Sequence, residues 1–212
     1  MSDPTTTGEP SSRGTRGRSR ALGPEELRSA VDALVDELIG RGIPARITIY
    51  GGAAMALVHY ERAATGDVDA SFFPSGDVAL AATQVATRLN LAADWLNSAA
   101  TAFLPPVSEQ HDAPVIIARG GVTIMVGSAR LLLAMKLRAS RPGRDGDDIA
   151  VLVRACGVRS MAEAQEVVDE IYLGEIEIPQ RGHALVKRAL GEVEIRLATR
   201  TVVLPAVELA SS

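Results

Sequence analysis

The chain has 212 residues, a formal net charge of −4 and 47% hydrophobic residues. This length suits one folded domain, or one domain with a small helical extension, and the acidic balance does not suggest a dedicated nucleic-acid binder. The single cysteine, Cys156, excludes an internal disulfide framework and a cysteine-based zinc site. Because no apolar run approaches the roughly 18 residues of a membrane span, and no signal-peptide core is present, we expect a soluble, cytoplasmic protein without a membrane partner.

The N-terminal segment is rich in Ser, Thr, Gly, Pro and Arg and contains almost no apolar residues. Such a composition cannot bury enough apolar surface to offset the entropy of ordering, which predicts a disordered tail over residues 1–22. Its arginines Arg13, Arg16, Arg18 and Arg20 make the tail basic. This charge fits either a solubilising leader or an arm that contacts RNA.

A helix is predicted next, from about Pro24 onward. Pro24 and the two glutamates after it suit a helix N-terminus, and the apolar residues from Leu27 to Leu38 recur at helical spacing. The glycines at 40 and 42 mark the end of this helix, and Pro44 prevents its continuation.

The stretch Ile47–Phe73 bears most directly on function. Its first residues, Ile47–Tyr50, are β-branched or aromatic, which predicts a buried strand. Gly51 and Gly52 break that strand, and Ala53–Glu61 is predicted to start a helix. Glycines at a strand-to-helix turn let the backbone approach a ligand, and the first N–H groups of a helix favour an anion such as phosphate. A plain turn is the alternative for a glycine pair alone.

Two aspartates follow in the sequence Asp67-Val68-Asp69. In a strand, Asp67 and Asp69 point to one face and Val68 points to the other. Adjacent carboxylates repel each other at neutral pH, and a shared divalent cation removes this repulsion, for which hard oxygen ligands suit Mg²⁺. The alternative is an acidic turn beside a strand, but internal strands rarely carry two carboxylates on one face without a cation. We therefore predict Asp67 and Asp69 as metal ligands.

A glycine turn followed by a D-x-D strand resembles the DNA polymerase β-like nucleotidyltransferase superfamily. The pattern GGAAMAL…R.AT.DVDA.F, followed by WLN, K-L and RD..DI segments, is similar to a small bacterial group related to abortive-infection and toxin-type nucleotidyltransferases. The resemblance implies transfer of a nucleoside monophosphate from an NTP to an acceptor hydroxyl, with release of pyrophosphate. It also implies that Asp67 and Asp69 are catalytic and hold Mg²⁺ or Mn²⁺.

The same resemblance assigns residues to the nucleotide. Gly51 and Gly52 are expected to bind phosphate through their backbone N–H groups alone, since Gly52 stands where many relatives have Ser. Arg62 and Thr65 match the R-x-[AS]-T pattern of the group and are expected at the nucleotide. For Arg62, an ordinary surface position is an equal alternative.

The rest of the chain reads as helices around one hairpin. Pro114–Ala118 and Val122–Val126 are short apolar runs either side of a glycine link, which predicts two paired strands. Ser128 is placed to cap a helix, and Ser160 with Glu163 forms a capping-box pattern. The predicted helices are Asp77–Leu89, Ala93–Phe103, Ala129–Ala139, Asp147–Ala155, Ser160–Tyr172 and Pro179–Arg196. Trp95 is expected in the core, and Asn97 either caps a helix or touches the substrate.

Lys136 lies on an unexpected face of its predicted helix. At about 100° per residue, Lys136 falls between Leu132 and Leu133 in the apolar arc, whereas Arg130, Ala134 and Arg138 form a solvent stripe. A lysine that points toward a core needs an anionic partner or must lose its charge. Snorkelling along the helix edge is the alternative. We predict that Lys136 points into a triphosphate pocket, is catalytic and binds the nucleotide, as K-L at this place in the resembling proteins also implies.

Two acids after Lys136 belong to the RD..DI segment. Asp145 and Asp148 fit either a helix N-terminus that carries acids for its own stability or a functional role. In the functional interpretation Asp148 is catalytic and orients Lys136 or serves as a base, with Asp145 as the next candidate. Many relatives place a third metal-binding carboxylate on a later strand, but Val122–Val126 has none. Asp148 is the residue available to substitute for it.

We therefore predict an α/β (α+β) protein with a small mixed sheet flanked by helices. Residues 23–150 are predicted to form a nucleotidyltransferase-fold domain, and residues 151–212 a helical extension and tail. The expected partners are an NTP, an RNA acceptor such as a tRNA 3′ end and, for a toxin, an antitoxin protein. The alternatives are a small-molecule nucleotidyltransferase and a non-catalytic nucleotide- or protein-binding module of the same fold.

Overall fold

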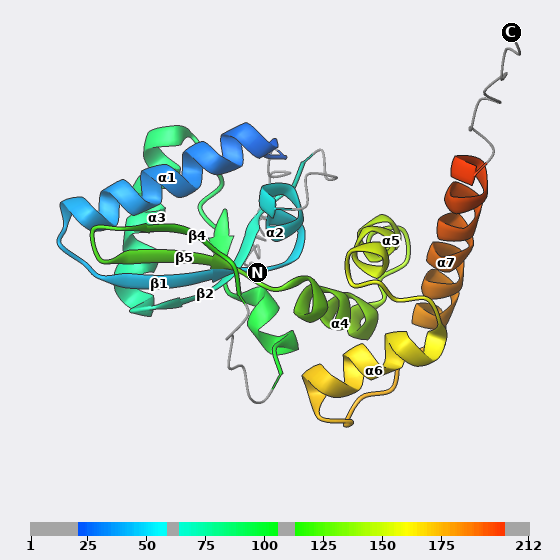
Figure 1. Ribbon diagram of the computed structural model, residues 1–212. Helices are drawn as coiled ribbons and strands as arrows, with labels where there is room; N and C mark the ends of the chain where they lie inside the picture. The colour runs from blue at the N-terminus through cyan, green and yellow to red at the C-terminus, as the bar shows by residue number, and fades with distance from the viewer. Residues whose placement is uncertain (1–20, 59–63, 106–112, 202–212) are drawn as a thin grey trace, which may run out of the picture.

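The computed structural model describes residues 21–58, 64–105 and 113–201, with side chains as far as residue 191. Over these residues the chain is a mixed α/β protein with one five-stranded sheet and seven helices, the last four of which follow the sheet (Figure 1). This confirms the predicted fold class. None of the described helices combines the length and apolarity that crossing a bilayer requires.

The elements alternate along the chain until the sheet is complete, and only helices follow. The strands are β1 (Ala45–Ile49), β2 (Val68–Phe73), β3 (Leu96–Asn97), β4 (Val115–Arg119) and β5 (Val122–Val126). The helices are α1 (Pro24–Gly40), α2 (Gly51–Val58), α3 (Ser75–Leu89), α4 (Ala129–Ala139), α5 (Gly146–Ala155), α6 (Met161–Tyr172) and α7 (Gln180–Thr201), with a short 3-10 helix, η1 (Ala99–Phe103), after β3.

The sheet has the order β3-β2-β1-β5-β4. Its central strand β1 runs antiparallel to β2 and parallel to β5, and the predicted hairpin of β4 and β5 is antiparallel. The register pairs Ile49 with Ala70 and with Val126. The carboxyl end of β1 therefore lies beside the start of β2, so the glycine turn and the aspartate strand meet at one edge of the sheet.

The two faces of the sheet differ in what covers them. Helices α1 and α3 pack on each other and on the face that carries Val68, Ile47 and Ile124, all three of which are buried. On the opposite face Asp69, Ser71 and Met125 are only partly buried, although Thr48 on the central strand is buried. The alternation of β2 therefore follows the prediction, with Val68 in the core and Asp69 on the open face.

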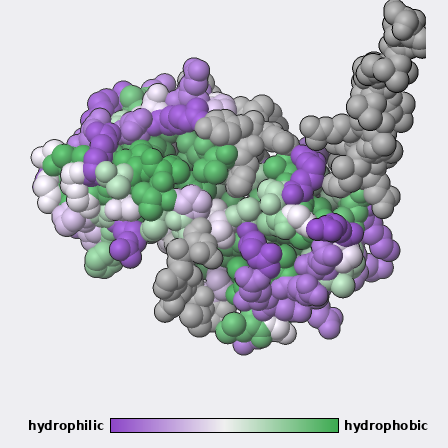
Figure 2. Space-filling model, in the orientation of Figure 1, coloured by the Kyte–Doolittle hydropathy of each residue, from purple (hydrophilic) through white to green (hydrophobic). Residues whose placement is uncertain are grey.

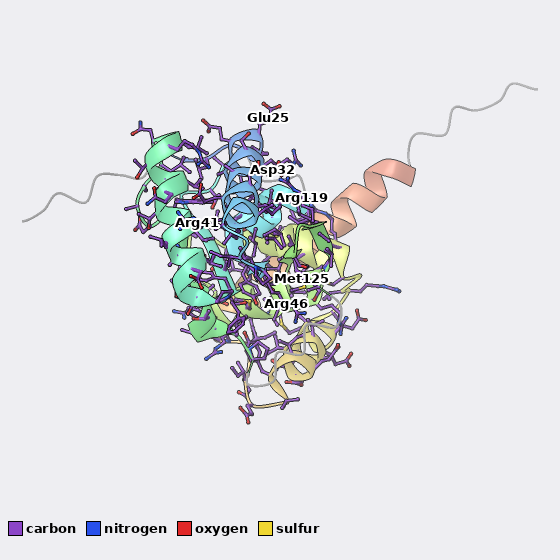
Figure 3. All side chains as sticks on the ribbon, turned by 90° about the vertical axis from the view of Figure 1, so that its left-hand side faces the viewer. Glu25, Asp32, Arg41, Arg46, Arg119 and Met125 are labelled. Atoms are coloured by element: carbon purple, nitrogen blue, oxygen red, sulfur yellow. The ribbon has the colours of Figure 1, made fainter. Side chains whose placement is uncertain are left out.

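The outer strand β4 is linked to α1 by ion pairs. Arg119 donates hydrogen bonds to Asp36 (2.7 Å) and to Asp32 (3.4 Å) on α1, and Figure 3 labels Asp32 beside Arg119. Strand β4 also exposes Val115 and Ile116. In Figure 2 a hydrophobic surface lies below the hydrophilic surface of α1, where Figure 1 places β4.

The four C-terminal helices form a second group of packed elements. Helix α4 contacts α5, α6 and α7, and its residues from Leu131 to Leu137 are all buried. The predicted solvent stripe is therefore wrong at Ala134, because α6 covers that face of α4. Ser128 caps α4 as predicted, by accepting a hydrogen bond from Leu131 N.

The predictions for two segments next to the sheet need correction. The predicted helix Ala93–Phe103 is instead β3 followed by η1, because this segment pairs with β2: Val68 N donates to Trp95 O at 2.6 Å. Helix α2 begins at Gly51 rather than Ala53, and its predicted end at Glu61 lies outside the described residues.

The predicted disordered tail ends too late. Leu22, its last residue, is buried and forms an isolated β-bridge with Thr65. The arginines proposed as an RNA-contacting arm lie outside the described residues.

Candidate functional site

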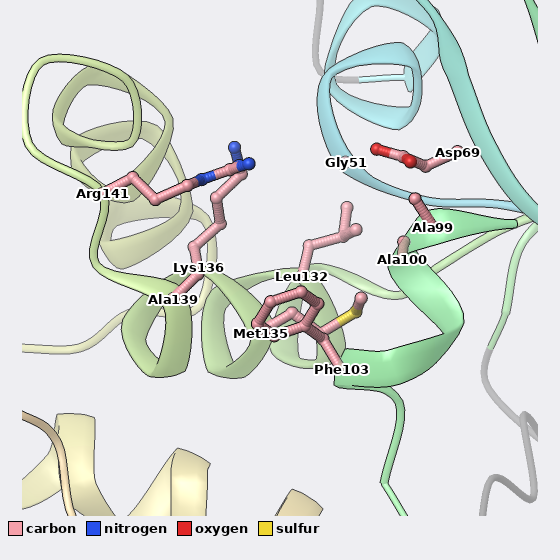
Figure 4. A pocket seen from close by; sticks show the side chains of 10 residues that line it. All are labelled: Gly51, Asp69, Ala99, Ala100, Phe103, Leu132, Met135, Lys136, Ala139 and Arg141. Carbon is pink, nitrogen blue, oxygen red and sulfur yellow. The ribbon is translucent and has the colours of Figure 1, made fainter. Parts of the chain in front are cut away.

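A pocket of about 540 Å³, part of it open to solvent, lies between the open face of the sheet and helix α4. Figure 4 shows carboxylate oxygens on its sheet side and the nitrogens of two cationic side chains on its helical side. Apolar side chains close the third side. The lining residues are Gly51, Asp69, Ala99, Ala100, Phe103, Leu132, Met135, Lys136, Ala139 and Arg141.

The sheet-side wall is built at the turn between β1 and α2. Gly51 has φ of +61°, a conformation that side chains with a Cβ disfavour. A Cβ at Gly51 would also lie 3.0 Å from Asp69 Oδ2. Tyr50 N donates to Asp69 O at 2.8 Å, which holds the two segments together at this point. Glycine at position 51 thus lets the backbone reach the aspartate carboxylate.

Asp69 is half-buried in this wall, and its surroundings disfavour its charge. Burial, and next the negative charge of Asp67, raise the pKa of the Asp69 carboxyl above its ordinary value of 3.8. The charges of Arg141 and Lys136 and a backbone hydrogen bond from Ala100 act in the opposite direction but do not outweigh burial. A cation bound beside Asp69 would stabilise the ionised carboxylate against both its burial and the charge of Asp67.

Asp67 lies one residue before β2 and is exposed. Asn97 links it to the neighbouring strand: the Asn97 amide donates to Asp67 Oδ2 at 3.2 Å, while Asn97 Oδ1 accepts from Ala99 N at 2.9 Å. Asn97 therefore caps η1 and also positions an aspartate. Thr65 holds the other side of the turn, since its buried hydroxyl donates to Asp67 O at 2.9 Å.

Lys136 points toward the core as predicted, and its ammonium group sits between two carboxylates. Lys136 Nζ donates to Asp145 Oδ1 at 2.9 Å and to Asp148 Oδ2 at 2.5 Å. Its side chain is only 7% exposed, yet it forms part of the pocket lining. The anionic partners that a buried lysine requires are thus provided by the start of α5.

Asp145 is the most heavily hydrogen-bonded acid in this cluster. Besides Lys136 it accepts from Arg141 three times: from the backbone N (2.9 Å), from Nε (3.0 Å) and from Nη2 (3.0 Å). Complete burial of Asp145 alone would raise its pKa, but the hydrogen bonds from Arg141 and the charge of Lys136 lower that pKa to about 2. Asp145 therefore stays ionised and fixes both cations of the helical wall.

The apolar side of the pocket is formed largely by η1 and α4. Phe103 lies at the end of η1, and its carbonyl accepts hydrogen bonds from the Tyr172 hydroxyl (2.5 Å) and from Arg138 Nη1 (3.4 Å). The Arg138 guanidinium also lies 5.7 Å from the centre of the Phe103 ring and 5.1 Å from that of Tyr172. Helices α4 and α6 thus hold the apolar wall in place by polar and cation–π contacts.

The structure brings some of the predicted site residues together at the pocket. Gly51, Asp69 and Lys136 line it. Two more lie close to lining residues. The charge of Asp67 raises the pKa of Asp69, and Asp148 accepts a hydrogen bond from Lys136.

The remaining predicted nucleotide ligands have other positions. Gly52 directly follows Gly51 in the same turn, and Thr65 bonds to the backbone of Asp67. Arg62 lies outside the described residues.

The sequence places Arg141 with Arg130, Arg138 and Arg144 on a modest basic surface suited to phosphate contacts, but it does not predict Arg141 or Phe103 in the pocket lining. Arg141 follows the end of α4 in a polar loop, where an arginine looks like any surface residue. The one signal in the sequence is that Asp145 lies four residues after Arg141. This spacing brings two side chains together on a helix, but it predicts no contact in a loop. Phe103 was placed in a helix, without a reason to aim it at a ligand.

A metal at this site would depend on two protein carboxylates. In residues 21–58, 64–105 and 113–201 there is no group of three or more His, Cys, Asp or Glu side chains that could hold a metal ion. Mg²⁺, however, is usually bound by one or two carboxylates together with substrate phosphates and water. Asp67 and Asp69 supply hard oxygens in mutual electrostatic conflict, so they fit Mg²⁺ or Mn²⁺ in a complex with phosphate.

Comparisons of the chain with protein-family models, with curated proteins and with solved structures find no match.

Proposed function

We propose that this protein is a Mg²⁺- or Mn²⁺-dependent nucleotidyltransferase that moves a nucleoside monophosphate from an NTP to an acceptor hydroxyl. One observation supports this most directly: the pocket places a carboxylate opposite two cations without joining them. Within the described residues, no ion pair or hydrogen bond connects Asp69 with Lys136 or Arg141. A ligand with a cationic and an anionic part, such as a metal–phosphate complex, would complete both walls.

In this proposal the chain acts mainly by positioning. Asp67 and Asp69 hold the metal, which would neutralise phosphate charge and make an acceptor hydroxyl easier to deprotonate. The backbone at Gly51 and Gly52 approaches the phosphates, and Lys136, oriented by Asp148, adds positive charge to the opposite wall. The acceptor hydroxyl loses its proton to solvent, and its oxygen bonds to the α-phosphorus as the bond from that phosphorus to the α,β-bridging oxygen breaks, so that pyrophosphate leaves with the bridging oxygen.

We propose RNA, and specifically a tRNA 3′ end, as the acceptor, because the motifs resemble toxin-type enzymes. An antitoxin protein would then be a partner of the chain. The arginines Arg130, Arg138, Arg141 and Arg144 suggest a modest basic surface near the pocket for phosphate contacts, but two of them are already engaged with other side chains. Arg130 pairs with Glu170, and Arg138 is stacked on Phe103 and Tyr172. A small hydroxyl compound is the alternative acceptor.

A transfer assay tests this proposal. The protein is incubated with Mg²⁺, each α-labelled NTP and total RNA, with small hydroxyl acceptors in parallel reactions. We expect label to appear on one acceptor and to fall at least 100-fold in Asp69→Asn, which keeps the size of the side chain and removes its charge. Asp77→Asn, an exposed acid at the start of α3, serves as the control and should keep full activity. Absence of transfer from every NTP to every acceptor would rule the proposal out.

One observation favours a second candidate, a nucleotide-binding module without catalysis. Strand β5 lies parallel to β1 beside the glycine turn, but its residues Val122–Val126 include no carboxylate. Saturable NTP binding with no transfer in the assay above would support this candidate.

A further inference from the structure

The two cations of the helical wall differ in how much of their hydrogen-bonding capacity the protein already uses. Lys136 Nζ has three donors, two of which are taken by Asp145 and Asp148, and its side chain is 7% exposed. Arg141 has five side-chain donors, of which the structure uses those of Nε and one on Nη2, and its side chain is 48% exposed. Arg141 therefore retains most of the donor capacity on this wall.

Arg141 is also held in a fixed orientation. Its guanidinium grips both oxygens of Asp145, which is completely buried. The backbone N–H of Arg141 binds the same carboxylate. An arginine that is already oriented loses little side-chain entropy when a ligand arrives, which favours tight binding.

The free side of this guanidinium faces the pocket. Arg141 lines the cavity, and Figure 4 shows its side chain extending toward Asp69 on the opposite wall. Both charges influence each other electrostatically but form no ion pair across the gap.

We propose that Arg141 is the residue that binds the anionic, polyphosphate part of the ligand in this pocket. Guanidinium groups bind phosphate oxygens with paired, charge-assisted hydrogen bonds. Asp145 fixes the guanidinium, and the apolar residues Phe103, Leu132 and Met135 lie alongside for the remainder of the ligand. This inference rests on the proposed function for the identity of the ligand, but it concerns binding and not transfer.

Binding of inorganic tripolyphosphate with Mg²⁺ to the full chain tests the proposal by calorimetry. We expect Arg141→Gln to weaken binding at least tenfold. Arg141→Lys keeps the charge but loses the paired geometry, so we expect an intermediate loss. Arg144→Gln is the matched control, because Arg144 is an exposed arginine in the same loop outside the pocket lining. The affinity of this variant for tripolyphosphate should stay within twofold of that of wild type. Melting temperatures of all three variants establish that they fold.

The proposal would be overturned if wild type and Arg141→Gln bound tripolyphosphate with the same affinity. It would also be overturned if Arg144→Gln lost as much affinity as Arg141→Gln, because the loss would then reflect surface charge alone. Absence of tripolyphosphate and NTP binding by the wild-type protein at millimolar concentration would also overturn it. If binding depends on Arg141 while no acceptor is labelled in the transfer assay, the anion site stands and the transferase proposal fails.

Discussion

Asp69 and Asp145 belong to opposite walls of one pocket, and their pKa values shift in opposite directions although burial raises both. Asp69 is half-buried with no cation in contact, and its pKa is raised, first by burial and then by Asp67. Asp145 is completely buried, yet its pKa is lowered to about 2 by Arg141 and Lys136, which outweigh burial. The difference separates a carboxylate that no cation of the described residues contacts from one that holds two cations in place.

The largest expected effect comes from Lys136→Met. This substitution leaves the buried carboxylates Asp145 and Asp148 without the cation between them, and removing one partner of a buried pair typically costs about 3–5 kcal/mol. Urea unfolding at pH 7 measures this loss. The control is Arg130→Met on the same helix, whose pair with Glu170 is exposed and should be worth about 1 kcal/mol or less. A loss below that of the control would contradict a structural role for the buried cluster.

Asp145→Asn should destabilise the protein in a way that depends on pH. Because the folded pKa of Asp145 is about 2, below its ordinary value of 3.8, its charge contributes roughly 2 kcal/mol above pH 4, which is lost as the pH falls toward 2. The difference in unfolding free energy between wild type and Asp145→Asn should therefore shrink as the pH falls from 4 toward 2. Asp147→Asn, an exposed neighbour, should show no such trend.

Gly51→Ala tests the close approach on the sheet wall. A residue with a Cβ at φ of +61° costs roughly 1–2 kcal/mol, and the new Cβ would press on Asp69 Oδ2. We expect this loss in urea unfolding together with weaker binding of Mg²⁺ and tripolyphosphate. Gly66→Ala is the control, since no atom lies within 4 Å of its added Cβ. If a folded Gly51→Ala protein bound metal and phosphate as wild type does, the turn at Gly51 would not be part of the binding site.

The smallest effect on stability is expected for Asp69→Asn, within about 0.5 kcal/mol at pH 7. Its pH trend should have the opposite sign to that of Asp145. A raised folded pKa means that Asp69 contributes stability below its unfolded pKa, and that this contribution is lost as the pH rises through the folded value. The unfolding free energy of wild type minus that of Asp69→Asn should therefore decrease as the pH rises from 3 to 7, as measured by urea unfolding at each pH. Parallel trends for the two variants would contradict the comparison between the walls.

Much of the fold could be predicted because local pattern and final environment agree. The hairpin of β4 and β5 has apolar runs around Gly120 and Gly121, both with positive φ, and the core face of α1 follows its apolar spacing. Lys136 could be placed coreward from helical periodicity alone. These features depend on residues within one or two turns of one another, which sequence spacing describes directly.

The rest depended on contacts between distant segments. Ala93–Phe103 has residues that favour a helix, but Trp95 donates its indole N–H to Ala82 O, and its own carbonyl accepts from Val68 N. Ala134 has a small side chain that fits either solvent or a helix contact, and only the position of α6 decides between them. Arg141 reaches the pocket because α4 ends at Ala139 and Ser140 follows with φ of +42°, a backbone reversal that the sequence does not indicate.

The 3-10 helix η1 is anchored to a different part of the molecule at each end. Its first residue, Ala99, bonds to Asn97 at the edge of the sheet, and its last, Phe103, bonds to Tyr172 and Arg138 in the helical group. Five residues at about 2 Å each make a strut of roughly 10 Å. Because η1 lines the pocket and joins the sheet to the helical group, its length helps to set the distance between the two walls. Inserting one residue into η1 would therefore move the two walls about 2 Å further apart. The side chains of both walls would stay the same, so the change would alter the length of ligand that fits between them.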